Sequence, residues 1–215
     1  MKSMPRYIPV SLGLMLLWML LVFYGSRVAL TGREMYCMAT ALDEMLPSIP
    51  FFSSIYLLAF VQWALGYYYI AAESKALCYR TLATELTAKT VSLFCFLLLP
   101  TTMERPVLTG TDFFSMLNRL IYALDPPNNL FPSLHCLESW FCMRYAWQVK
   151  KLPRWYPWVM LVFTLLVMAS TIFVKQHVVA DVLAAVVLGE ICIRLTQKLE
   201  PEKIFFRIEA RLARK

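Results

Sequence analysis

Apolar runs of about 20 residues recur along this 215-residue chain, and no other feature limits its fold as strongly. A run of that length, wound as a helix, crosses the ~30 Å hydrocarbon core of a bilayer. Hydrophobic residues make up 60% of the chain and charged residues 16%, against roughly 45–50% and about 25% in a soluble domain. This composition excludes a secreted module, a disordered tail and a soluble α/β enzyme.

The pattern predicts an all-α, polytopic membrane protein with six transmembrane helices. The chain leaves no room for a second domain, so we expect one integral membrane domain over residues 1–215. Glu85 and Lys89, four residues apart at the start of the third span, are expected to pair and reach the membrane interface. The predicted spans are residues 8–24, 49–72, 83–102, 133–149, 155–174 and 177–198.

The basic residues predict how these spans are oriented. Cytoplasmic segments of membrane proteins carry an excess of Lys and Arg. With both termini in the cytoplasm, 16 of the 21 Lys and Arg residues lie inside and 5 outside. We therefore expect an N-in, C-in topology, and we assign the net charge of +7 to membrane sidedness rather than to nucleic-acid binding.

Two segments outside the spans are expected to form amphipathic helices. One is the outer segment 111–124. The other is the tail 200–215, which follows a core expected at residues 100–198. We expect the tail to lie on the anionic cytoplasmic leaflet, with a solvated helix as the alternative. Its apolar face would carry Ile204, Phe205, Ile208 and Leu212.

The six cysteines indicate neither a disulfide framework nor a metal site. Most of them lie in or beside apolar segments, and none forms a CxxC pair. We interpret them as small buried hydrophobic residues. We expect no metal ion and no cofactor.

The chain has only two histidines, and both lie at the outer ends of predicted spans. His135 opens the span 133–149 and His177 opens the span 177–198. Ionisable groups at membrane depth are costly and usually functional. Asp181 follows His177 by four residues, so on a helix the two share a face. Its carboxylate can accept the proton of one ring nitrogen, fix the tautomer and leave the other nitrogen free to attack.

Arg105, followed by Pro106, lies in the outer connection between the third and fourth spans. Its guanidinium offers a planar fork for phosphate oxygens. An Arg-Pro pair is commonplace by itself. It gains significance here because it lies on the same side of the membrane as both histidines.

These residues resemble the three ordered motifs of the type-2 phosphatidic acid phosphatase superfamily, a family of membrane phosphatases and phosphotransferases. The first motif ends in Arg-Pro, and the second is Pro-Ser-x-His. The third is Ser-Arg, five residues, His, three residues and Asp. The resemblance runs from residue 105 to about residue 190. The matching residues are Arg105 and Pro106, then Pro132, Ser133 and His135, then Ser170, His177 and Asp181.

The resemblance implies phosphoryl transfer in two steps without a metal. His177 would attack phosphorus and form a phosphohistidine, with Asp181 orienting it. His135 would protonate the leaving oxygen and then activate water or an acceptor hydroxyl. Ser133 also stands where an N-cap residue is expected, and capping is compatible with phosphate contact. The phosphate-binding residues would be Arg105, Ser133, Lys175, Ser170 and Thr171.

Two positions depart from the family pattern. Leu98 stands where the first motif has Lys, and Thr171 stands where the third motif has Arg. Lys175 and Arg119 are candidates to replace the missing cations. The stretch Lys175-Gln176-His177 is similar to branches related to inositol-phosphoceramide and sphingomyelin synthases.

The favoured function is a lipid-phosphate phosphatase acting on the non-cytoplasmic face of a membrane, most simply the cell membrane. Its partners would be the bilayer and a phospholipid or polyprenyl-phosphate substrate. The alternative is a phosphotransferase that moves a phosphorylated headgroup onto a lipid acceptor. Two further alternatives are a catalytically inactive scaffold and a membrane cytochrome with His135 and His177 as haem ligands.

Overall fold

The computed structural model describes residues 4–212, and most of them are helical. The all-α prediction holds apart from two strands of two residues each, which the sequence analysis did not predict. In chain order the elements are α1 (Tyr7–Ala29), β1 (Tyr36–Cys37), α2 (Ala41–Met45), α3 (Phe52–Glu73), α4 (Lys75–Leu98), β2 (Thr101–Thr102), α5 (Phe113–Leu124), α6 (Leu134–Ala146), α7 (Tyr156–Phe173), α8 (Val179–Leu199) and α9 (Glu202–Leu212).

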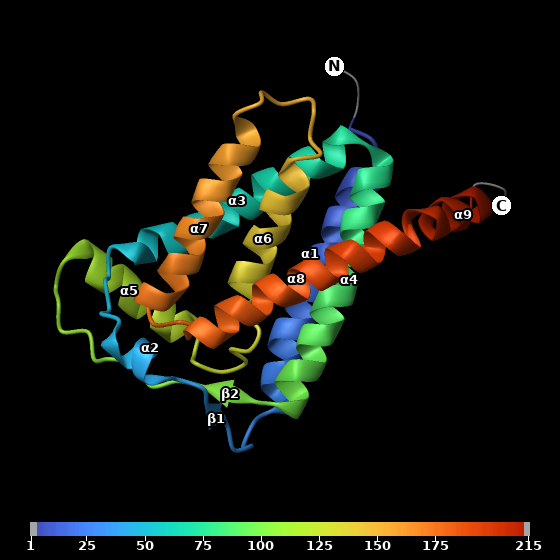
Figure 1. The fold of residues 1–215 in the computed structure, drawn as a ribbon. Coiled ribbons are helices and arrows are strands. Elements are labelled where there is room, and N and C mark those ends of the chain that lie inside the picture. The colour runs from blue at the N-terminus through green and yellow to red at the C-terminus, as the bar shows by residue number, and fades with distance from the viewer. Residues whose placement is uncertain (1–3, 213–215) are drawn as a thin grey trace.

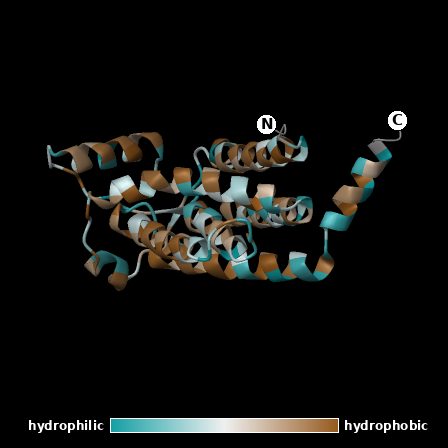
Figure 2. Ribbon diagram, turned by 90° about the horizontal axis from the view of Figure 1, so that it is seen from above, coloured by the Kyte–Doolittle hydropathy of each residue, from teal (hydrophilic) through white to brown (hydrophobic). Residues whose placement is uncertain are grey.

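Four helices, α1, α3, α4 and α7, are long and apolar enough to cross a membrane. Figure 2 shows that hydrophobic residues run along much of the helical bundle. Leu17, Phe94 and Leu165 are each more than half exposed on these helices. Apolar surface of this extent is stable against lipid rather than water. The chain is therefore an integral membrane protein.

The other two predicted spans are less plainly membrane helices. The prediction 133–149 corresponds to α6, which has only 13 residues. The prediction 177–198 corresponds to α8, which has 21 residues and carries four charged side chains. These are Asp181, Glu190, Arg194 and Lys198.

The predicted third span was wrong at its start. Helix α4 begins at Lys75 rather than at residue 83, because the Ser74 hydroxyl accepts a hydrogen bond from the backbone N–H of Leu77 and caps the helix. Glu85 and Lys89 do pair, but they do not reach the interface. Both are fully buried beside Glu138 of α6.

Helices α3, α6, α7 and α8 enclose the core. Figure 1 shows α1 and α4 side by side along one flank, with α8 crossing the bundle obliquely. Completely buried core residues come from α3, α6, α7 and α8 in turn: Ala59, Phe141, Val167 and Ala185. The core therefore joins α6 and α8 to α3 and α7.

The connections gather at two opposite ends of the bundle (Figure 1). One end holds the N-terminal part of α1, the α3–α4 junction and the α6–α7 connection. The opposite end holds α2, α5 and the strands. There β1 pairs in parallel with β2, Tyr36 opposite Thr101, and this joins two connections that are far apart in sequence. Both histidines lie at this second end.

The predicted tail helix is present as α9. It turns away from α8 at Glu200, whose φ is 46°, and ion pairs Lys75–Glu209 and Arg80–Glu202 hold it to α4. Ile204 and Ile208 are exposed as expected. Phe205 is not, because its ring lies 5.4 Å from that of Tyr79 on α4. The side chain of Leu212 lies outside the described part.

Candidate active site

His177 is presented by the turn that ends α7. The backbone N–H of Gln176 donates to the Thr171 carbonyl over 2.9 Å, and that of Lys175 donates to the Ile172 carbonyl over 3.0 Å. These two bonds form a Schellman motif, which needs a left-handed residue just past the helix. Lys175 supplies it with a φ of 59°. The His177 N–H also bonds to the Thr171 carbonyl, over 3.1 Å, so the turn fixes the backbone of the histidine.

Asp181 orients the His177 ring. Its Oδ2 lies 3.2 Å from His177 Nδ1 and also accepts the backbone N–H of Val178 over 3.0 Å. The carboxylate is fully buried. Because a carboxylate accepts, His177 carries its proton on Nδ1, and Nε2 is the nitrogen that Asp181 leaves free. The predicted contact between His177 and Asp181 exists. However, His177 lies before the first residue of α8, so the two residues do not share a helix face. The Asp181 side chain instead points back toward the start of α8, as in a capping box.

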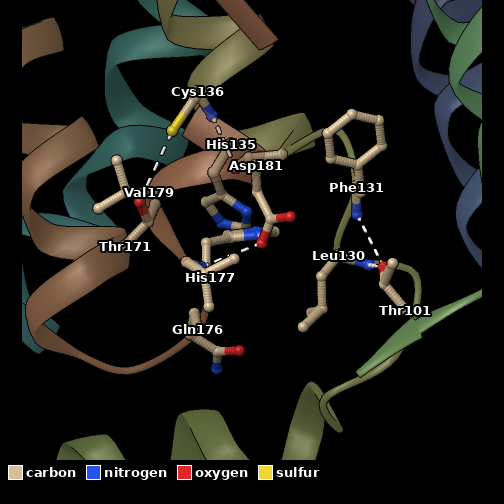
Figure 3. A network of polar contacts seen from close by, with 12 residues as sticks. Thr101, Leu130, Phe131, His135, Cys136, Thr171, Gln176, His177, Val179 and Asp181 are labelled. Atoms are coloured by element: carbon tan, nitrogen blue, oxygen red, sulfur yellow. Dashed lines mark hydrogen bonds and ion pairs between the residues drawn. The ribbon is translucent and has the colours of Figure 1, made fainter. Parts of the chain in front are cut away.

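His135 stands at the start of α6, where Ser133 is the N-cap. The Ser133 hydroxyl accepts the N–H of Cys136 over 3.3 Å. The Ser133 N–H donates to the Asp181 carbonyl over 3.2 Å, which ties the start of α6 to the first turn of α8. This bond brings the two histidines together. Figure 3 shows both imidazoles beside Asp181, and both rings line one small cavity.

The His135 ring is held mainly by aromatic side chains of α3. It stacks on Tyr56, with ring centroids 4.1 Å apart, and the Trp63 ring lies at 5.0 Å. Its Nδ1 lies 3.3 Å from the Tyr56 hydroxyl. Its Nε2 is buried and has no hydrogen-bond partner in residues 4–212. That nitrogen is available for proton transfer.

Arg105 lies next to the histidines through Gln176. Its guanidinium donates to the Gln176 side-chain carbonyl and, over 2.8 Å, to the Asp125 backbone carbonyl. It also lies 4.5 Å from the centre of the Tyr122 ring. Burial lowers the pKa of Arg105, while the Asp125 carboxylate opposes that shift. Arg105 Nε and Gln176 Nε2 are both buried donors with no acceptor among the described residues, which suits an anion.

Three other predicted phosphate ligands point elsewhere. Ser170 and Thr171 donate to carbonyls of their own helix, Val167 and Met168, over 2.7 and 2.8 Å. The Lys175 ammonium donates to the carbonyls of Asp43 and Leu46, over 2.8 and 2.6 Å. The left-handed turn at Lys175 directs its side chain toward α2 rather than toward the histidines.

The altered motif position Leu98 and the candidate replacement cation Arg119 also lie apart from the histidines. Leu98 is exposed at the end of α4. Arg119 is exposed and donates to the carbonyls of Leu108 and Gly110. Neither residue lines the cavity that the histidines share.

Sequence reasoning missed four residues of this neighbourhood: Tyr56, Asp125, Gln176 and Asp43. Asp43 accepts the N–H of Val179 over 2.7 Å and so caps α8 from a separate segment. Although burial raises its pKa, hydrogen bonds from Thr40 and Val179 and the nearby Lys175 outweigh burial, so the pKa is lowered. The one signal in the sequence was position, since Asp43, Asp125 and Gln176 lie in predicted outer connections and Tyr56 lies near the outer end of the predicted span 49–72.

An apolar groove leads to His135 from the membrane-facing side. It has a volume of about 260 Å³ and lies between α1, α3 and α5, with Phe23, Leu57 and Leu124 among its walls. A second groove of about 250 Å³ continues it between α1 and α3, since the two share Met19 and Phe60. By contrast, the cavity between the histidines measures about 20 Å³. That volume holds roughly one water.

A comparison with protein-family models matches residues 12–205 to the PAP2 superfamily. This match covers most of the chain, including all the residues just described. The chain belongs to the PAP2 superfamily. No curated protein and no solved structure gave a significant match.

PAP2 proteins are generally phosphatases or phosphotransferases, so membership indicates an enzyme that acts on a phosphate-containing substrate. The PAP2 resemblance inferred from three motifs is confirmed. In residues 4–212, no three His, Cys, Asp or Glu side chains gather as they would to hold a metal ion. The side chains beside the shared cavity that could meet a phosphate in this PAP2 protein include two imidazoles, a guanidinium and an amide.

Proposed function

We propose that this PAP2 protein is a lipid-phosphate phosphatase that releases phosphate from a phosphomonoester or diphosphate lipid through a phosphohistidine on His177. One observation carries the proposal. A histidine oriented by a buried carboxylate and a second histidine with a free ring nitrogen line one cavity, and an apolar groove ends there. The groove has the character needed for a lipid tail, and Arg105 and Gln176 have the donors needed for its phosphate.

The chemistry divides between the two histidines. His177 Nε2 attacks phosphorus, and the bond from phosphorus to the lipid oxygen breaks. His135 Nε2–H gives its proton to that oxygen. Water then loses a proton to His135 and attacks the phosphohistidine, the P–N bond breaks, and phosphate leaves. Arg105 stabilises the charge on the equatorial oxygens.

We further propose that α6 and α8 complete six membrane crossings within one domain, with both termini in the cytoplasm. Support comes from the grouping of the connections at two ends of the bundle (Figure 1) and from the basic residues, of which this topology assigns 16 of 21 to cytoplasmic segments of the sequence. The histidines would then face the extracytoplasmic side of the cell membrane.

The test is phosphate release by the purified full-length protein in detergent with EDTA. Phosphatidate, phosphatidylglycerophosphate and a polyprenyl diphosphate serve as substrates, and His177→Ala is the control. We expect release from at least one lipid and background release from the variant. Transfer of a phosphorylated headgroup to diacylglycerol or ceramide, without phosphate release, would favour the phosphotransferase instead. If both assays give nothing, the phosphatase proposal fails on these lipids and the inactive scaffold becomes the alternative to test.

Arg105 should be needed for binding the phosphate, and Arg119 should not. Arg105→Ala is expected to lower kcat/KM by about 10²-fold, a loss of ~3 kcal/mol, because hydrogen bonds to charged groups in a buried site contribute about 1.5–3 kcal/mol. Arg119→Ala is the matched control and should change kcat/KM less than about threefold. Equal losses in the two variants would contradict the assignment of Arg105.

A further inference from the structure

We infer that the site accepts one negative charge from its substrate, so that a phosphate group binds as a monoanion or takes up a proton as it binds. This charge limit rests on the proposed function, which places the phosphate beside His177. Such a site selects the phosphomonoester over the diphosphate lipid, because a diphosphate brings a further negative charge.

Two cations that the motifs would supply are missing. Leu98 stands in place of a lysine and Thr171 in place of an arginine, and the Thr171 hydroxyl donates to its own helix. Lys175 and Arg119 donate to backbone carbonyls away from the histidines. Arg105 donates to an amide and a backbone carbonyl, and it forms no ion pair with a carboxylate in residues 4–212. Arg105 is therefore the cation that remains for a phosphate.

The other cations near the cavity are each matched by a carboxylate. Arg27 of α1 pairs with Asp125, which lines the cavity. The Lys175 ammonium binds the Asp43 carbonyl over 2.8 Å, so it lies near the carboxylate of the same residue. These two pairs add no net charge, because each joins one cation to one anion.

Asp181 balances Arg105. Its carboxylate is fully buried, and its partners in the described chain are the His177 ring and the Val178 N–H rather than a cation. With both histidines neutral, the charges around the cavity therefore sum to zero. The reaction needs a proton on His135, which adds one positive charge and matches one negative charge of the substrate.

Groups farther from the cavity add negative rather than positive charge. Glu138 lies one turn along α6 from His135, in a buried cluster where Glu85 and Glu138 share the ammonium of Lys89. Two carboxylates against one ammonium leave an excess negative charge when both are ionised. Exposed acidic residues line the outer pocket beside Lys175: Glu44 and Glu104. The other titratable side chains near the histidines are uncharged at neutral pH: Tyr56, Tyr122 and Cys136.

A second negative charge on the substrate would have no counter-charge among the described residues. An uncompensated charge in a buried site is costly, so a dianion must gain a proton there, on the phosphate or on His135. The second pKa of a phosphomonoester is about 6, so most of it is a dianion at neutral pH. A phosphodiester carries a single charge and needs no proton.

The first test compares two ligands that differ by one charge, and it does not depend on activity. Octylphosphonate and its monomethyl ester share the same tail, and neither can release phosphate, because a carbon–phosphorus bond joins the tail. Calorimetry with the purified full-length protein in non-ionic detergent gives both Kd values. We expect the ratio of the phosphonate Kd to the ester Kd to rise about tenfold per pH unit above the second pKa of the phosphonate. Titration of the free protein affects both ligands and cancels in the ratio.

The second test changes the charge of the site. Asp125→Asn removes one negative charge with little change of shape, and Gln176→Lys adds one positive charge beside Arg105. Each should let the dianion bind without a proton, so the ratio should stay level as the pH rises. Val107→Lys is the matched control, because Val107 is 89% exposed and does not line the cavity. Its ratio should rise as in the wild type.

The outcomes separate the charge limit from the proposed function. A ratio that stays level or falls with pH in the wild type overturns the charge limit, and so does a rise that persists in both charge variants. Either result leaves the phosphatase proposal standing, since that proposal depends on phosphate release. The expected ratios in a protein that releases no phosphate defeat only the phosphatase proposal. If neither ligand binds, both fail.

Discussion

Replacing Asp181 with asparagine is expected to lower kcat by about 10⁴-fold, the loss that the same change causes in a Ser-His-Asp triad. The carboxylate oxygen accepts two N–H groups, from Val178 and from His177. Asparagine can place either its NH₂ or its oxygen at this position. With the NH₂ there, the bond to Val178 is lost and His177 Nδ1 must accept, so the proton moves to Nε2 and no lone pair remains to attack phosphorus. With the oxygen there, both bonds remain, but the negative charge that stabilises the cationic imidazole during the attack is lost.

The matched control is Asp43→Asn. Asp43 also accepts a backbone N–H at the start of α8 and makes no hydrogen bond to either histidine in the described residues. We expect Asp43→Asn to lower the free energy of unfolding by about 1 kcal/mol, as the loss of a helix cap does. Its kcat should change less than threefold. Phosphate release measures kcat, and thermal denaturation in detergent checks folding. An Asp181→Asn protein with near wild-type kcat would remove Asp181 from the mechanism.

The sequence predicted the His177–Asp181 contact because both residues belong to one turn of chain, and local spacing decides such contacts. Local spacing also misled. It placed Lys175 beside His177, whereas the left-handed backbone at Lys175 turns its ammonium to carbonyls of α2. A Schellman turn at a lysine is not visible in the sequence, because glycine is the residue that usually marks one.

Tyr56 and Asp125 were beyond sequence reasoning for a different reason. Tyr56 lies 79 positions before His135, and only the packing of α3 against α6 brings the rings together. Asp125 meets Tyr56 because α5 ends against α3. In an apolar chain, a tyrosine near a span end resembles any interface aromatic residue. Tertiary packing alone distinguishes it.

Hydropathy identified α1, α3, α4 and α7 because their outward faces are uniformly apolar. It failed at the start of α4 because it counts a polar residue as a boundary wherever it occurs. Glu85 and Lys89 were therefore assigned to an interface. In the structure they lie inside the bundle, where α4 meets α6 and the apolar faces turn outward. A polar pair that is satisfied within the protein leaves the lipid-facing surface unchanged.

That buried cluster predicts a large loss of stability on removing its cation. Lys89 contacts Glu138 Oε1 at 2.6 Å and also pairs with Glu85, and Tyr67 bonds to both carboxylates. All three charged residues are at most 2% exposed. Lys89→Met leaves two carboxylates without a counter-charge, and removing one partner of a buried pair costs about 3–5 kcal/mol. In a chain of this size that is a fall in Tm of roughly 6–20 °C.

Thermal denaturation in detergent measures the effect, with Lys203→Met as the matched control. Lys203 of α9 pairs with Glu200, the residue that ends α8, and both side chains are exposed. An exposed ion pair contributes about 0–1 kcal/mol, so the Tm of Lys203→Met should stay within a few degrees of wild type. Combining Lys89→Met with Glu85→Gln and Glu138→Gln should recover much of the lost Tm, because the uncompensated charge is gone. A triple variant as unstable as Lys89→Met would mean that Lys89 stabilises the bundle through the packing of its alkyl chain, and that the charges balance one another at little net benefit.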